Sequence, residues 1–255
     1  MLGWLFRPSC PCDASAKNWI EERLEWLAAE FNDSAFTGRT VVLPTPEFFP
    51  DPYDGSKKAV RMLLDRVCGY MDVVPELVAL MFTKNKTSIY LVNEDGHAIP
   101  DAAGTYHEGR NKFVIRIDQS GMEDQMSLVG TIAHELAHVR LLGESRIMRD
   151  VFDNELLTDL TVVHFGLGIF LANAPRHWDA HYTKWPDTDL KKPEYMTPPM
   201  FGWALAHIAW FRDDHKPGWA RHLNSSARTN MMQGLRYLNA TNDSWYRPAR
   251  VRKKR

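Results

Sequence analysis

The chain has 255 residues, 44% of them hydrophobic, and a formal net charge of −1. It is therefore long enough to bury a full core, and its charge balance argues against a general nucleic-acid binder. It contains no run of about 20 apolar residues, the length that a membrane-spanning helix requires. The N-terminal apolar run is too short for a signal peptide, and three cysteines predict no disulfide framework, so we expect a cytoplasmic protein.

Residues 1–14 are expected to form a loose leader. It contains Cys10 and Cys12, which could be half of a metal site, but a structural zinc ion needs four ligands and no second cysteine pair follows. A helix is predicted over residues 16–31, because its apolar residues recur at helical spacing. Its candidate N-caps are Asp13 and Ser15, and its apolar stripe consists of Trp19, Ile20, Leu24, Leu27 and Phe31.

A short strand is expected at residues 40–43, followed by a proline-rich run at 44–55 that must be irregular. Ser56 can cap a helix over residues 57–70, and a further short helix is predicted to start at Pro75 and reach Phe82. Three aromatic side chains are expected to anchor the irregular run to the core: Phe48, Phe49 and Tyr53.

The periodicity then changes from helical to alternating. Residues 88–92 and 112–117 are predicted strands, with a possible third piece around 105–107. In the second of these strands apolar and polar residues largely alternate, which is typical of a half-buried antiparallel strand.

The motif that carries chemistry lies in a helix predicted over residues 123–142, with Gly143 as its stop. Within it, His134, Glu135 and His138 form the pattern H-E-x-x-H. Residues four apart lie on one helix face, so both imidazoles can bind one zinc ion, and the Glu can reach a zinc-bound water as general base. The rest of the helix is strongly apolar, and the alternative is that these three are hydrogen-bonded core residues.

A second motif, N-E-x-x-x-D, opens a helix predicted over residues 154–172 and contains Glu155 and Asp159. The two motifs together resemble the gluzincin, or thermolysin-like, metallopeptidases over roughly residues 120–172. This resemblance implies that Glu155 is the third zinc ligand and that Asp159 supports a zinc-bound imidazole. A carboxylate that accepts the second N–H of a ligating His is common in zinc sites.

Most of the chain also resembles a family of uncharacterised bacterial zinc peptidases. The shared stretches are the CPxD leader, VVLPTPEFFPDPYDG, the HELAH helix, and ELLTDL with GLGIFLANA. This resemblance implies no particular substrate.

Two other residues are candidate third ligands. Glu144 lies where metzincins place their last His, but Leu141 occupies the position of the glycine that allows the necessary turn. His164 lies nine residues after Glu155, about 180° round the helix, so both cannot face one ion. His177 and His181 are expected to be surface residues.

The C-terminal third is expected to begin with an irregular stretch, 175–196, that could line a substrate cleft. Thr197 can cap a helix opened by Pro198 and Pro199, and a last helix is predicted over 219–238. The tail, residues 247–255, is strongly basic and expected to be disordered, with at most weak contact to nucleic acid.

Peptide hydrolysis requires a donor that stabilises an oxyanion. Gluzincins commonly take this donor from a downstream Tyr or His, which makes Tyr195, His207 and His181 candidates here. We select Tyr195, because it ends the stretch that would return to the cleft.

The sequence thus predicts a mostly helical α+β protein, with a small antiparallel sheet next to a pair of active-site helices. Residues 15–174 are expected to form the catalytic domain and 175–246 a helical part packed on it. The predicted function is a zinc metallopeptidase with one Zn²⁺ ion that acts on a peptide or protein. The alternatives are a non-catalytic zinc-containing interaction or regulatory protein and hydrolysis of another kind of bond.

Overall fold

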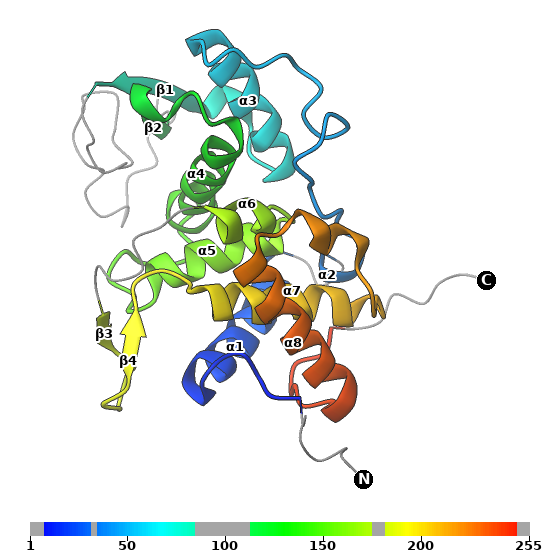
Figure 1. Ribbon diagram of the computed structural model, residues 1–255. Coiled ribbons are helices and arrows are strands. Elements are labelled where there is room, and N and C mark those ends of the chain that lie inside the picture. The colour runs from blue at the N-terminus through cyan, green and yellow to red at the C-terminus, as the bar shows by residue number, and fades with distance from the viewer. Residues whose placement is uncertain (1–7, 32–34, 85–112, 175–181, 249–255) are drawn as a thin grey trace. The chain divides into compact units, whose positions relative to one another are not determined.

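The computed structural model describes residues 8–31, 35–84, 113–174 and 182–248. They form an α+β fold that is mostly helical, as predicted (Figure 1). The chain divides into two compact units, one of residues 44–154 and one that joins residues 1–43 to 155–255. The strands predicted at 88–92 and 105–107 lie outside the described residues. Within those residues, none of the helices has the length and apolar character that crossing a bilayer requires.

The helix α3 of the first unit spans Lys57–Tyr70, as the sequence predicts. Ser56 Oγ accepts a hydrogen bond from the Ala59 N–H at 3.2 Å and thereby caps the helix. The apolar face of α3 is buried through Val60, Leu63, Leu64 and Val67.

The irregular run that precedes α3 is fixed by aromatic side chains, as expected. The Tyr53 hydroxyl donates to the Met122 carbonyl at 2.5 Å, and the Tyr70 hydroxyl donates to the Phe48 carbonyl at 2.7 Å. Phe49 is buried. These contacts add to a local turn, in which the Phe48 and Phe49 N–H groups both bond to the Thr45 carbonyl at 3.0 Å.

The helix predicted over Pro75–Phe82 is wrong. The chain forms a single 3₁₀ turn, η1 (Pro75–Leu77), and then the strand β1 (Val78–Thr83). A short apolar run such as VALMF does not distinguish a strand from a buried helix by its periodicity, and here pairing with another strand decides.

Strand β2 (Phe113–Asp118) confirms the predicted strand, but it pairs with β1 in parallel, with Leu80 opposite Ile115. The antiparallel arrangement predicted for it is therefore wrong. Strands of parallel pairs are often covered on both faces. Val114 and Ile115, neighbours that point to opposite faces, are both buried.

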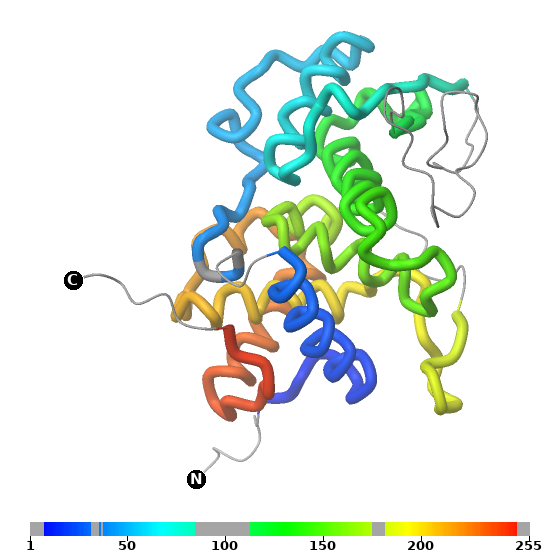
Figure 2. The backbone as a smooth tube through the Cα atoms, turned by 180° about the vertical axis from the view of Figure 1, so that it is seen from behind, coloured from blue at the N-terminus to red at the C-terminus, as the bar shows by residue number. Residues whose placement is uncertain are grey.

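Helix α4 (Gln125–His138) follows, beside α3 (Figure 2). Asp124 caps it by accepting from the Ser127 N–H at 3.0 Å. The next five residues, η3 (Val139–Gly143), wind as a π-helical turn, so that the Glu144 N–H bonds to the Val139 carbonyl at 3.0 Å. The predicted helix is thus confirmed, with a wider last turn and an end at the expected glycine.

The second unit begins with α1 (Ala14–Phe31), which Asp13 caps by accepting from the Ala16 N–H at 2.9 Å. Four members of the predicted stripe are buried and Phe31 is half-buried. The short helix α2 (Ala35–Gly38) follows. The strand predicted at 40–43 is wrong: in the described part of the chain this segment makes no ladder, and its Val42 N–H bonds to the Gly166 carbonyl at 2.9 Å.

The helix predicted over residues 154–172 is two helices, α5 (Asn154–His164) and α6 (Gly168–Asn173). The break is at Gly166, whose φ is +88° and where an added Cβ would lie 2.4 Å from the Thr40 carbonyl oxygen. Only glycine combines this backbone conformation with so close an approach.

The stretch predicted to be irregular contains an antiparallel hairpin of β3 (Tyr182–Lys184) and β4 (Lys191–Pro193). Helix α7 (Pro198–Phe211) begins at the predicted proline, although the Thr197 side chain makes no capping hydrogen bond. It packs on α8 (Ser225–Thr241) (Figure 1). The single last helix predicted over 219–238 is instead the 3₁₀ segment η4 (Gly218–His222) and then α8. Asn224 separates the two and caps α8 by accepting from the Ala227 N–H at 2.9 Å.

Candidate metal centre

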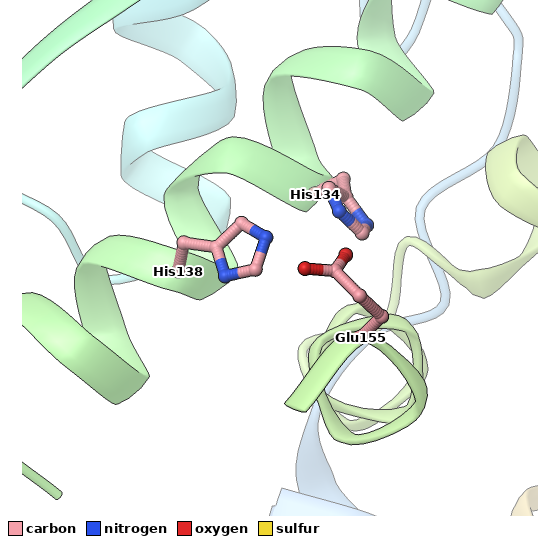
Figure 3. Close-up of side chains that lie close together, drawn as sticks. All are labelled: His134, His138 and Glu155. Carbon is pink, nitrogen blue, oxygen red and sulfur yellow. The ribbon is translucent and has the colours of Figure 1, made fainter. Parts of the chain in front are cut away.

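The three predicted zinc ligands lie together. His134 and His138 project from one face of α4, and Glu155 projects from the first turn of α5, with its carboxylate facing the two imidazoles (Figure 3). One ligand atom from each side chain lies within 4.8 Å of the other two. Both histidines are buried and Glu155 is half-buried.

These residues fit a zinc ion. Two His with one Glu is a usual protein ligand set of a catalytic zinc, with bond lengths of about 2.0–2.2 Å. Tetrahedral ligands at such bond lengths lie about 3.4 Å from one another. Atoms that lie within 4.8 Å of one another need to approach by at most about 1.4 Å to reach this spacing. The same set also binds Fe²⁺, so the donors alone do not select the metal.

Glu135 lies next to His134 on α4 and is only 5% exposed. It is not a member of the group of three ligands. A general base must lie within hydrogen-bond reach of the proton that it accepts, and in H-E-x-x-H helices the Glu next to the first His takes that position.

Asp159 lies one turn after Glu155 on α5 and is fully buried. Its Oδ2 accepts a hydrogen bond from the Met196 backbone N–H at 3.0 Å. No pattern in the sequence indicates this contact, because it joins residues that are 37 positions apart. It ties the segment between β4 and α7 to α5, and it places the backbone of the half-buried Tyr195 next to the same carboxylate.

The other weighed ligands are placed elsewhere. Glu144 forms ion pairs with Arg140 at 2.7 Å and Arg146 at 2.9 Å. His164 is buried among aromatic rings, with its ring centroid 4.8 Å from that of Phe36 and 5.3 Å from that of Phe165. His177 and His181 lie outside the described residues.

His207, weighed as an oxyanion donor, is fully buried in α7. Its Nδ1 lies 3.0 Å from the Trp203 carbonyl oxygen and its Nε2 lies 3.1 Å from Ser244 Oγ. Burial lowers the pKa of this ring to about 4. The nearby Glu21 carboxylate is paired with the Lys17 ammonium at 3.1 Å, so the two largely neutralise each other. His207 therefore acts as a neutral structural residue.

We expect the burial of His207 to make the unit sensitive to acid. Below pH 6.5 the unfolded chain binds a proton that the folded ring does not, so the free energy of unfolding should fall by about 3 kcal/mol as the pH is lowered to 4. Urea unfolding at pH 7 and pH 4 measures this loss. His207→Gln should lose about 3 kcal/mol less than the wild type over this range, whereas the exposed His215→Gln should behave as the wild type. An equal loss in His207→Gln and wild type would contradict the assignment.

No protein-family model, curated protein or solved structure matches this chain.

Proposed function

We propose that this protein is a zinc-dependent hydrolase of peptide bonds. One observation carries the proposal: ligand atoms of His134, His138 and Glu155 lie within 4.8 Å of one another. The first two are the histidines of an H-E-x-x-H helix, and the third opens the helix that follows. The three thus combine a usual zinc ligand set with the Glu that peptide hydrolysis by this motif requires.

Zinc and Glu135 have different roles in this chemistry. Zinc, when bound, acts as a Lewis acid on the scissile carbonyl and lowers the pKa of water to about 7. Glu135 accepts a proton from the attacking water and delivers it to the leaving amine, so that one carboxylate serves as base and then as acid. Its burial keeps that proton from exchanging with solvent between the two steps.

Two further residues take part in this proposal. Asp159 supports a ligating imidazole, because a buried carboxylate that accepts the second ring N–H fixes the tautomer and orientation of the ring. Tyr195 supplies the hydroxyl that stabilises the oxyanion. The Met196–Asp159 hydrogen bond supports this role, since it holds the chain next to Tyr195 against α5.

The metal site itself is tested by metal content. After treatment with a chelator, dialysis against zinc and removal of the free metal, we expect about one zinc per chain in the wild type by mass spectrometry. Glu155→Gln should bind zinc more weakly by more than about 100-fold, because loss of a ligand costs more than loss of a supporting residue. Zinc and iron are both measured, since the ligand set accepts either ion.

Glu144→Gln is the matched control. It removes a carboxylate that lies close to the ligands in sequence but forms ion pairs with arginines, and it should bind as much zinc as the wild type. A wild type that retains neither metal would refute the proposal. Stoichiometric zinc without hydrolysis of any peptide would favour the alternative of a non-catalytic zinc protein.

A further inference from the structure

An arginine in the segment that joins the two ligand-bearing helices has no acceptor within the chain. Arg149 lies between the π-helical turn η3 and helix α5 and is half-buried. Its Nε is enclosed and has no hydrogen-bond partner, and no described residue forms an ion pair with its guanidinium. Carboxylates stand one and four residues later, at Asp150 and Asp153, but Arg149 pairs with neither.

Other half-buried arginines show that this is an exception. Arg140 and Arg146, close by in sequence, both pair with Glu144, and Arg212 donates to two backbone carbonyls at 2.7 Å. The remaining half-buried arginines of the described residues also have partners. A guanidinium that is partly removed from water without an acceptor is unfavourable, so an acceptor on a bound ligand would remove a cost that the chain leaves uncompensated at Arg149.

The backbone that carries Arg149 starts beside the end of α4. The Ile147 N–H bonds to the Leu141 carbonyl at 3.2 Å, and Leu141 lies three residues after the ligand His138. Arg149 is the second residue after this contact, so it belongs to a segment whose start is fixed next to the helix that carries both histidines.

Two consecutive turns then lead into α5. The Val151 N–H bonds to the Met148 carbonyl at 3.4 Å, and the Asn154 N–H bonds to the Val151 carbonyl at 3.3 Å. Because the first and last Cα atoms of such a turn lie less than about 7 Å apart, Met148 lies within about 14 Å of Asn154, the residue before Glu155. In an extended substrate, residues two to four positions from the scissile bond lie about 7–13 Å from it. The segment of Arg149 is therefore within the range of these substrate residues.

The same segment exposes two large apolar side chains. Met148 and Phe152, on either side of Arg149, are both exposed. Large apolar side chains are unfavourable in water, so their position favours a stretch that contacts another molecule over one that is only solvated.

The chemistry of the guanidinium indicates the group that it would bind. Its planar fork donates two parallel N–H bonds, and a carboxylate accepts both with its two oxygens. A peptide carries this group at its C-terminus and in the side chains of Asp and Glu.

We propose that Arg149 binds a carboxylate of the substrate, either the C-terminal carboxylate or an acidic side chain two to four residues from the scissile bond. Two observations carry the proposal: the enclosed Nε without a partner, and the hydrogen-bonded turns that fix this segment between the ligand-bearing helices. It rests on the proposed peptide hydrolysis and adds a substrate class and a specificity-determining residue to it.

Matched pools of peptides test this preference. One pair of pools ends in a carboxylate or in its amide, and a second pair carries Glu or Gln at one position. The zinc-loaded wild type should cleave one acid pool about 10–100-fold faster than its amide counterpart at low concentration, which is the usual contribution of a hydrogen bond to a charged group. The pair that shows the difference identifies which carboxylate is bound.

Arg149→Gln should lose the preference for the acid pool and keep the zinc content of the wild type. Arg149→Glu should reverse it, so that the amide pool is cleaved faster. The matched control is Arg228→Gln, which removes an exposed arginine of α8 and should keep the preference. Where Arg149→Gln does not fold, the comparison of acid and amide pools with the wild type still decides.

Binding without turnover separates this proposal from the proposed hydrolysis. The same pools are passed over immobilised, zinc-loaded Glu135→Gln, which should retain an acid pool at least about tenfold better than its amide, and the further change Arg149→Gln should abolish the difference. Cleavage of acid and amide pools at equal rates, or a preference that survives Arg149→Gln, would overturn the role of Arg149 and leave peptide hydrolysis standing. Retention of an acid pool that the wild type does not cleave would refute hydrolysis and support carboxylate binding. Pools that are neither cleaved nor retained would refute both.

Discussion

Replacing Glu135 with Gln is expected to slow peptide hydrolysis by about 10²–10⁴-fold, the usual contribution of a general acid–base group, while the zinc content stays that of the wild type. The amide keeps the size of the carboxyl but cannot accept the proton of the attacking water. Because Glu135 is not among the three ligand side chains, the metal should remain. Hydrolysis of a pooled library of quenched fluorescent peptides, with metal analysis of the same samples, measures both quantities.

Glu144→Gln controls for the loss of a negative charge near the ligand-bearing helix. Glu144 follows the π-helical turn and forms ion pairs with arginines, so removal of its charge should leave the rate of hydrolysis unchanged. Full activity in Glu135→Gln, or equal losses in both variants, would show that the carboxylate of Glu135 takes no part in the chemistry.

Gly202→Ala is expected to lower the free energy of unfolding by about 3 kcal/mol, the upper part of the usual cost of overpacking a core. At this position in α7 an added Cβ would lie 2.5 Å from the Asn230 Cβ and 2.7 Å from the Met231 backbone nitrogen, both in α8. A helix backbone cannot move aside as a flexible side chain can, so α7 and α8 would have to separate. Urea unfolding followed by circular dichroism measures the loss.

The matched control is Gly69→Ala in α3, where an added Cβ has no atom within 4 Å. There the better helix propensity of Ala should stabilise the protein by up to about 1 kcal/mol. Equal stability changes in the two variants would mean that α7 and α8 do not approach each other as closely as the structure has it.

Local signals in the sequence predicted the elements that depend on local physics. Helix α3 has a serine cap and an apolar stripe, and its bounds followed from these alone. The prediction was wrong where a distant partner decides. The run after Leu77 becomes a strand because β2 pairs with it, and the helix that begins at Asn154 breaks at Gly166 against the Thr40 carbonyl.

The same distinction applies to the candidate site. The spacing of His134 and His138 placed both on one face of α4, because four residues make about one helical turn. Glu155 followed from the resemblance to gluzincins, and no local rule brings it to the histidines. The hydrogen bond from Met196 to Asp159 could not be predicted, since a backbone N–H carries no signature in the sequence.

The π-helical turn after His138 determines where this region tolerates a change in length. An α-helical N–H bonds to the carbonyl four residues earlier, whereas the Glu144 N–H reaches back five residues, to Val139. The turn thus contains one residue in excess of an α-helical turn, and a single deletion within 139–143 can be absorbed by rewinding it. A deletion between His134 and His138 cannot be absorbed in this way, because it changes the spacing of the two imidazoles themselves. The chain can therefore lose one residue directly after its second metal-binding histidine, because no later ligand lies on the same helix at a spacing that the loss would change.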